Sequence, residues 1–354
     1  MSIKELRAKA REVGSDKKMA IALPLFLWLV LLYFLGRIFQ WVSGPEINPI
    51  VGIIYGILAL LLTLSGGYAL ITRCLQVARG EETSSFFKEA FGSGITNSLK
   101  VACGLFLKLL PLFILLAVAV FLYFYGVASS LGGIDKISQI ADGSLKIDDI
   151  TFDPSGVVWL ILGLVLAFIV EIVLTVKSFK YLLVTFLKHD YPDEKVKELI
   201  NKSGEMMYGN KAKAFVIPYT FIGWILLAVV ISVIVGALVG AILSMLDSII
   251  LSAIATVITY FIMSFVYAYM LLTMTEFYLE RNPLEINNPD YVKPETNSPL
   301  YTKIAALIIC LPIILSIILV GVGTSLYNKA VESIQSSSMQ MDGMTEYLQS
   351  IEDK

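Results

Sequence analysis

About seven apolar runs of roughly 20 or more residues follow one another along this chain, separated by polar segments. At a rise of 1.5 Å per residue, each run is long enough to cross the ~30 Å hydrocarbon layer of a bilayer. Apolar residues make up 57% of the sequence and charged residues 16%, whereas charged residues form about a quarter of a soluble domain. The sequence therefore predicts an all-α, polytopic transmembrane helix bundle of about seven spans, with lipid as its surroundings.

The predicted bundle of six spans covers residues 19–279 and follows a basic amphipathic lead-in at 1–18. Two amphipathic connectors, at 72–98 and 188–213, join consecutive spans on one side of the membrane. An acidic loop, at 127–155, lies on the other side. The predicted spans run over about 19–41, 50–71, 99–125, 154–189, 214–243, 249–278 and 303–327.

A C-terminal extension follows the bundle. It consists of a loop rich in Pro and Asn at 280–302, the seventh span at 303–327 and a polar tail at 328–354. Apolar residues recur in the tail at three- and four-residue spacing, which is typical of an amphipathic helix or a short coiled coil. An oligomer formed through the tail is one interpretation, and a helix packed on the outer surface is the other.

Lys and Arg gather in alternate polar segments. The N-terminus, the two connectors and the loop after the sixth span are rich in them, and the opposite segments hold only Lys136, Lys146, Lys329 and Lys354. The positive-inside rule then places the N-terminus in the cytoplasm and, with seven spans, the C-terminus outside the cell membrane.

The connectors and the lead-in each carry an apolar face. In the second connector this face is formed by Val196, Leu199, Ile200, Met206 and Met207, and the opposite face is charged. In the first connector it is formed by Phe86, Phe87, Ala90 and Phe91, and in the lead-in by Ile3, Leu6, Ala10 and Val13. Such helices lie in the headgroup layer, bind a partner, or pack under their own bundle.

Two ionisable residues fall inside predicted spans, Lys108 in the third and Glu171 in the fourth. Counted from the basic residues at the ends of their spans, they lie at matching depths. We therefore predict an intramembrane ion pair near a helix kink at Pro111. A structural pair, two side chains that reach the membrane surface separately, and a polar ligand pathway are the three interpretations.

Glycine pairs at G-x-x-x-G spacing predict close helix packing at Gly52 and Gly56 in the second span, and at Gly236 and Gly240 in the fifth.

Signatures of enzymes and metal sites are missing. There is no G-x-S-x-G, H-E-x-x-H or Walker loop. The three cysteines lie in or beside apolar runs, and the one histidine, His189, has no second His or Cys near it. The sequence predicts a non-enzymatic protein with no cofactor, no metal and no nucleic-acid partner.

The run from Phe179 to Leu227 resembles an uncharacterised bacterial integral-membrane family, domain of unknown function 975. Its pattern is an amphipathic helix, then Ser-x-x-x-Met-x-Gly-x-Lys, then a span bearing Phe-Ile-Gly-Trp. The matching residues here are Ser203, Met207, Gly209, Lys211, Phe221, Ile222, Gly223 and Trp224. The resemblance covers about residues 1–281, implies a protein of the bacterial cytoplasmic membrane, and implies no activity.

Two functions remain open from the sequence. One is a membrane module that binds a lipid or a membrane or cytoplasmic protein partner through its cytoplasmic connectors. The alternative is a small-solute transporter or channel that uses Lys108 and Glu171 in the membrane interior.

Overall fold

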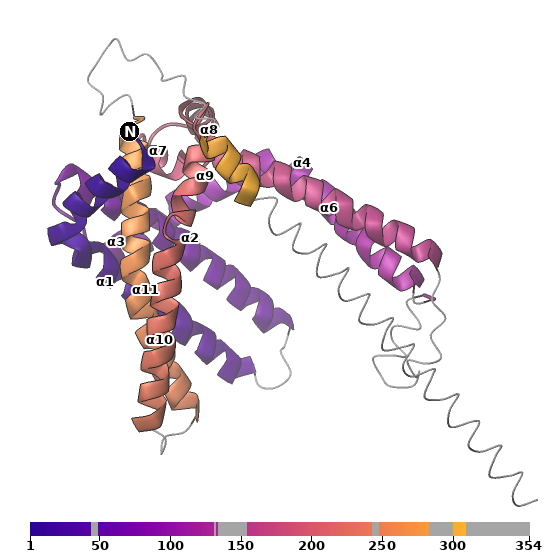
Figure 1. The fold of residues 1–354 in the computed structure, drawn as a ribbon, viewed down its shortest axis with the longest axis horizontal. Helices are drawn as coiled ribbons and strands as arrows, with labels where there is room; N and C mark the ends of the chain where they lie inside the picture. The colour runs from indigo at the N-terminus through magenta and orange to yellow at the C-terminus, as the bar shows by residue number, and fades with distance from the viewer. Residues whose placement is uncertain (44–48, 131, 134–153, 243–247, 283–299, 309–354) are drawn as a thin grey trace, which may run out of the picture. The chain divides into compact units, whose positions relative to one another are not determined.

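The computed structural model of this chain describes residues 1–43, 49–130, 132–133, 154–242, 248–282 and 300–308. All regular secondary structure in these residues is helical (Figure 1). The first compact unit, Met1–Asn297, contains α1 (Ile3–Ser43), α2 (Pro49–Arg79), α3 (Phe86–Phe91), α4 (Ser93–Ser130), α6 (Pro154–Lys180), α7 (Val184–Asp190), α8 (Val196–Met206), α9 (Lys211–Tyr219), α10 (Ile222–Ile242) and α11 (Ser248–Leu279). In the second unit, Ser298–Lys354, residues 300–308 are helical.

Six helical stretches among these residues are long and apolar enough to cross a membrane. They are Ile3–Ser43, Ile50–Arg79, Ser93–Ser130, Ser155–Asp190, Lys211–Leu238 and Ser252–Leu279. This confirms the predicted class, a multi-pass helical bundle. The seventh predicted span and the polar tail lie mostly outside the described residues, so the count of seven stays a prediction.

The lead-in is not a separate surface helix, because α1 runs without a break from Ile3 into the first span. Its predicted apolar face is buried at Ile3, Leu6 and Ala10. A Cβ atom placed on Gly14 would lie 3.0 Å from Cδ1 of Leu272 on α11. The lead-in therefore packs on the chain itself.

A proline inside α1 frees a backbone carbonyl that another helix then binds. Pro24 has no N–H to donate to the carbonyl of Ala20, four residues earlier. Nε of Arg73, on α2, donates to that carbonyl instead. The guanidinium group thus joins α1 to α2 at the point where α1 lacks its own hydrogen bond.

Two spans that the apolar pattern predicts as single helices are each divided. The fourth is α6 followed by a turn and then α7, and the fifth is α9 followed by α10. Pro218, one residue before the end of α9, has no N–H to donate to the carbonyl of Ala214, so the last turn of α9 lacks one hydrogen bond. Both divisions add short helices beside the connectors.

α4 and α6 form an antiparallel pair that packs backbone against backbone at three glycines. A Cβ atom would lie 2.2 Å from the Leu160 nitrogen at Gly126, 2.3 Å from the Ser130 nitrogen at Gly156, and 2.4 Å from the Tyr123 nitrogen at Gly163. No side chain fits at such distances, so glycine sets the separation of these helices.

Gly56 and Gly236, two of the glycines predicted for close packing, do not bring helix backbones together in this way. A Cβ atom on Gly56 would meet nothing within 4 Å, and one on Gly236 would make an ordinary contact of 3.8 Å with Ala255. Gly52 and Gly240 are partly exposed. The spacing alone does not show which face of a helix meets a neighbour, since Gly56 faces open space whereas Gly236 faces α11 at an ordinary contact distance.

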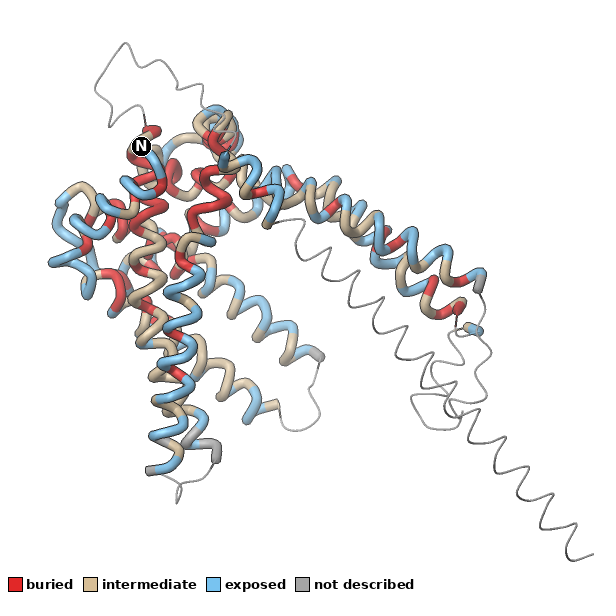
Figure 2. The backbone as a smooth tube through the Cα atoms, in the orientation of Figure 1, coloured by how far each residue is buried: buried red, intermediate tan, exposed pale blue. Residues whose placement is uncertain are grey.

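Buried residues gather at one end of the first unit. Figure 2 shows them concentrated where α7, α8, α9 and the start of α1 meet the end of α11. Along the spans most apolar side chains are exposed, as expected for helices surrounded by lipid. We call this buried region, together with the first connector that Arg79 joins to it, the connector end.

Candidate functional site

The connector end is held by a carboxylate with several donors around it. Both oxygens of Asp190, at the end of α7, accept hydrogen bonds of 2.9 Å from the guanidinium group of Arg79 on α2. Asn282 donates to the same carboxylate at 2.9 Å, and the hydroxyl of Tyr278 donates as well. The Asp190 side chain is 5% exposed, so this ion pair is buried and shielded from solvent.

A second carboxylate, Glu280, follows α11. It pairs with Arg281 at 2.7 Å, with Lys213 at 3.4 Å, and with the amino group of Met1. Burial alone would raise the pKa of Glu280, but the amino group and the two basic side chains outweigh burial and hold that pKa below its ordinary value. Glu280 is therefore a carboxylate at neutral pH that connects α1, α9 and α11.

A third carboxylate, Glu276, is fully buried on α11. Nζ of Lys9, on α1, lies 2.6 Å from its Oε2 atom, although the orientation does not make a hydrogen bond. The charge pair attaches the lead-in part of α1 to α11.

The first four residues of the family-like pattern shape the second connector. Ser203 donates to the carbonyl of Lys180 at 2.9 Å and so fixes α8 to the end of α6. Met207 is fully buried. Gly209 has φ of +71°, a left-handed conformation that favours glycine, and Lys211 then begins α9. These residues build the turn between α8 and α9.

The last residues of the pattern meet the lead-in. Phe221 is buried, and the guanidinium carbon of Arg7 lies 4.8 Å from the centre of its ring. Trp224 is 56% exposed. A Cβ atom on Gly223 would meet nothing within 4 Å.

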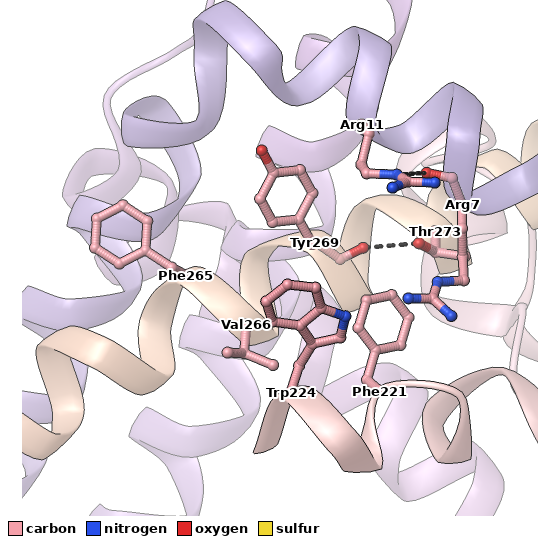
Figure 3. A pocket seen from close by; sticks show the side chains of 8 residues that line it. All are labelled: Arg7, Arg11, Phe221, Trp224, Phe265, Val266, Tyr269 and Thr273. Atoms are coloured by element: carbon pink, nitrogen blue, oxygen red, sulfur yellow. Dashed lines mark hydrogen bonds between the residues drawn. The ribbon is translucent and has the colours of Figure 1, made fainter. Parts of the chain in front are cut away.

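Phe221 and Trp224 also line a pocket between α1, α10 and α11, with a cavity volume of about 380 Å³ (Figure 3). Its lining residues are Arg7, Arg11, Phe221, Trp224, Phe265, Val266, Tyr269 and Thr273. We call this the arginine pocket. It combines two positive charges with an aromatic wall.

The apolar faces of the two connectors differ in exposure. Leu199 and Ile200 on α8, and Met207 directly after it, are buried against the chain itself. On α3, by contrast, Phe87 is 39% exposed and Phe91 52% exposed. α8 therefore offers only its charged face to a partner, with Tyr208 exposed just after it, whereas α3 offers two aromatic side chains of its own apolar face.

The predicted ion pair between Lys108 and Glu171 is not present in this structure. Both side chains are exposed, and no salt bridge joins them in the part of the chain that is described. The glycine contacts between α4 and α6 place Glu171 level with Leu115. That is seven residues, or about 10 Å, from Lys108, so their depths do not match. α4 continues through Pro111 without ending.

The carboxylate cluster and the arginine pocket were not predictable from the sequence. The partners of Asp190 and Glu280 come from helices far apart in the chain, and no local spacing indicates which basic residue each meets. The only local signal is that Asp190, Tyr278 and Glu280 stand at the ends of long apolar helices. In the described part of the chain, no three or more His, Cys, Asp or Glu residues are arranged to hold a metal ion.

A family model described as "Protein of unknown function (DUF975)" matches residues 1–279. The match ends at the last residue of α11, close to residue 281, where the resemblance seen in the sequence ends. No curated protein and no solved structure is similar enough to this chain to match it.

Proposed function

The chain belongs to the DUF975 family of proteins of unknown function, and we propose that it is a non-enzymatic, multi-pass protein of the bacterial cytoplasmic membrane that binds lipid at its connector end. The N-terminus and both connectors face the cytoplasm in this proposal. The strong bias of Lys and Arg toward these segments supports that orientation.

The observation that carries the proposal is the contrast between α3 and α8. A short helix between two spans with exposed aromatic rings is typical of a helix in the headgroup layer. On α3, Phe87 and Phe91 are exposed and pack beside Trp28, at ring-centre distances of 6.2 and 5.4 Å. Because α8 keeps its apolar face for its own chain, lipid binding is favoured over a protein that would dock on that face.

Exposed basic side chains around the same end add attraction for anionic lipid, worth about 1 kcal/mol per residue near the surface. They include Lys4, Lys17, Lys18, Lys88, Lys100, Lys195 and Lys197. The transport alternative has no comparable support, since Lys108 and Glu171 are exposed and unpaired with each other.

Thermal unfolding of the full chain in detergent tests the proposal. Phosphatidylglycerol is expected to raise Tm more than phosphatidylcholine, because its headgroup is anionic and is attracted to the basic side chains. A ligand at a concentration of a hundred times its Kd stabilises the folded state by about 2.7 kcal/mol. Added salt should reduce the difference. If neither lipid raises Tm and a cytoplasmic protein is instead recovered in stoichiometric amount after cross-linking in native membranes, the partner is a protein and the proposal fails.

The orientation has its own test. A cysteine introduced by Lys197→Cys on the exposed face of α8 should react with a membrane-impermeant maleimide in inside-out vesicles and not in intact cells. Labelling in intact cells would contradict a cytoplasmic connector end.

A further inference from the structure

Arg7 and Arg11 lie beside α11 without a carboxylate partner, unlike many of the basic residues at this end of the chain. Lys9, Arg79, Lys202, Lys213 and Arg281 each pair with a carboxylate. No carboxylate within the described ranges makes a salt bridge with either Arg7 or Arg11. Two neighbouring positive charges therefore lie at the edge of the bundle without an anion from this chain.

Most hydrogen-bond donors of the two guanidinium groups remain available. An Nη atom of Arg7 donates to the carbonyl of Thr220 at 3.2 Å, and Nε of Arg11 donates to the carbonyl of Arg7 at 3.3 Å. Each guanidinium group carries five N–H donors. The two side chains stand one turn apart on α1, so both can reach one bound group.

The arginine pocket extends from this charged end along α11. Its lining residues on α11 run from Phe265 to Thr273, eight residues or about 12 Å along the axis. Thr273 is nearer to the end of α11 at Leu279, where the connector end begins. Figure 3 shows the two arginines at one end of the pocket and Phe265 at the other.

The order of chemical groups along the pocket matches that of a phospholipid. Guanidinium groups at the headgroup level bind phosphate with charge-assisted hydrogen bonds. Trp224 and Tyr269 stand next along the wall, and amphipathic aromatic residues are typical of the level between headgroups and chains. Phe265 and Val266 then provide apolar surface.

We propose that the arginine pocket binds one anionic phospholipid, with its phosphate between Arg7 and Arg11 and one acyl chain along Trp224, Val266 and Phe265. This inference rests on the proposed lipid-binding function and names its site and ligand class. A free phosphate ion would satisfy the arginines but would leave the aromatic wall uncovered. The apolar wall therefore favours the lipid.

The test uses the full chain in detergent, titrated with phosphatidylglycerol, phosphatidylcholine or inorganic phosphate. Native mass spectrometry counts bound lipid, and thermal unfolding reports stabilisation. The double variant Arg7→Gln with Arg11→Gln removes the charged end of the pocket. Lys108→Gln with Lys177→Gln is the control, since both lysines are exposed on the α4–α6 pair, lie outside the pocket, are not among the basic side chains counted above, and remove the same charge.

The arginine variant should bind phosphatidylglycerol roughly ten- to a hundredfold more weakly, and the lysine control should bind it as the wild type does. A second variant, Val266→Phe, fills the cavity without changing charge and should also lose bound lipid. If the arginine variant does not fold, the Val266 variant decides, and unchanged binding there overturns the proposal.

Three other results would also overturn it. Equal losses in the arginine and lysine variants would mean that lipid binds by general surface charge; the pocket fails but lipid binding at the connector end stands. Equal stabilisation by inorganic phosphate would assign the arginines to a free anion. A wild-type chain that binds no phospholipid would overturn both the pocket and the proposed function.

Discussion

Arg79 and Asp190, 111 residues apart in the sequence, form a two-point hydrogen-bonded ion pair with both N–O distances at 2.9 Å. The pair joins the end of α2 to the end of α7, and it therefore links the second span to the end of the fourth. The Arg79 side chain is 17% exposed and that of Asp190 is 5% exposed. Removing one partner alone would leave a buried charge without its counter-charge and would destabilise the folded state.

Arg79→Ala is therefore expected to destabilise the chain by about 3 kcal/mol, because it leaves Asp190 buried with its main counter-charge removed. Denaturant unfolding in detergent measures the change. Lys202→Ala is the control, because its pair with Glu194 is 41% and 30% exposed and should contribute about 0–1 kcal/mol. Equal losses of unfolding free energy in the two variants would show that the buried Arg79 pair stabilises the chain no more than the exposed Lys202 pair.

Arg73 and Pro24 should be energetically coupled, since the guanidinium group binds the carbonyl that Pro24 leaves free. Pro24→Ala supplies the missing N–H within α1. Arg73→Ala should then cost about 1 kcal/mol less in that background than in the wild type. The bond from Arg73 to the carbonyl of Ser84, at 2.7 Å, is present in both backgrounds and cancels. A double-mutant cycle with no coupling would contradict this account of the contact.

Glu280 should make the stability of the chain sensitive to acid. Its pKa in the folded state lies below the ordinary value of 4.5, so the unfolded state binds a proton first as pH falls. The stabilisation is fully present above about pH 4.5 and is lost as pH falls through the folded pKa. Glu280→Gln should flatten the dependence of Tm on pH in this acid range, whereas Glu198→Gln, at an exposed position on α8, should not. Parallel curves for the wild type and Glu280→Gln would refute the assignment.

Two glycines of the family-like pattern should respond in opposite ways to alanine. Gly209→Ala should cost about 1–2 kcal/mol, since φ of +71° is unfavourable for a residue with a Cβ atom. Gly223→Ala has open space around it in the first turn of α10 and should be neutral or stabilising by up to about 1 kcal/mol. Unfolding measurements on both variants check the contrast, which would disappear if the glycines had the same role.

The sequence was sufficient for the features that depend on local pattern. Hydropathy located the six described spans, and the predicted start of the fourth span at residue 154 agrees with the start of α6 at Pro154. A proline at the first helical position needs no N–H partner, so this signal is independent of tertiary packing.

The register between helices was not predictable in the same way. Depths of Lys108 and Glu171 were counted from the basic ends of two spans, but α6 ends at Lys180 and α7 continues beyond it, so the count started from unequal levels. Likewise, Gly56 has the spacing of a packing glycine and faces open space, whereas Gly126 has no such pattern and touches the backbone of α6. Which face turns inward is decided by the neighbouring helix.

A high-resolution cryo-electron microscopy map of the full chain in nanodiscs containing phosphatidylglycerol tests the lipid-binding account most directly. The account predicts headgroup density within about 3 Å of both the Arg7 and Arg11 guanidinium groups, continuing as a chain past Trp224 toward Phe265. A pocket that is closed by the chain's own side chains, or arginines that pair with carboxylates of this protein, would contradict it.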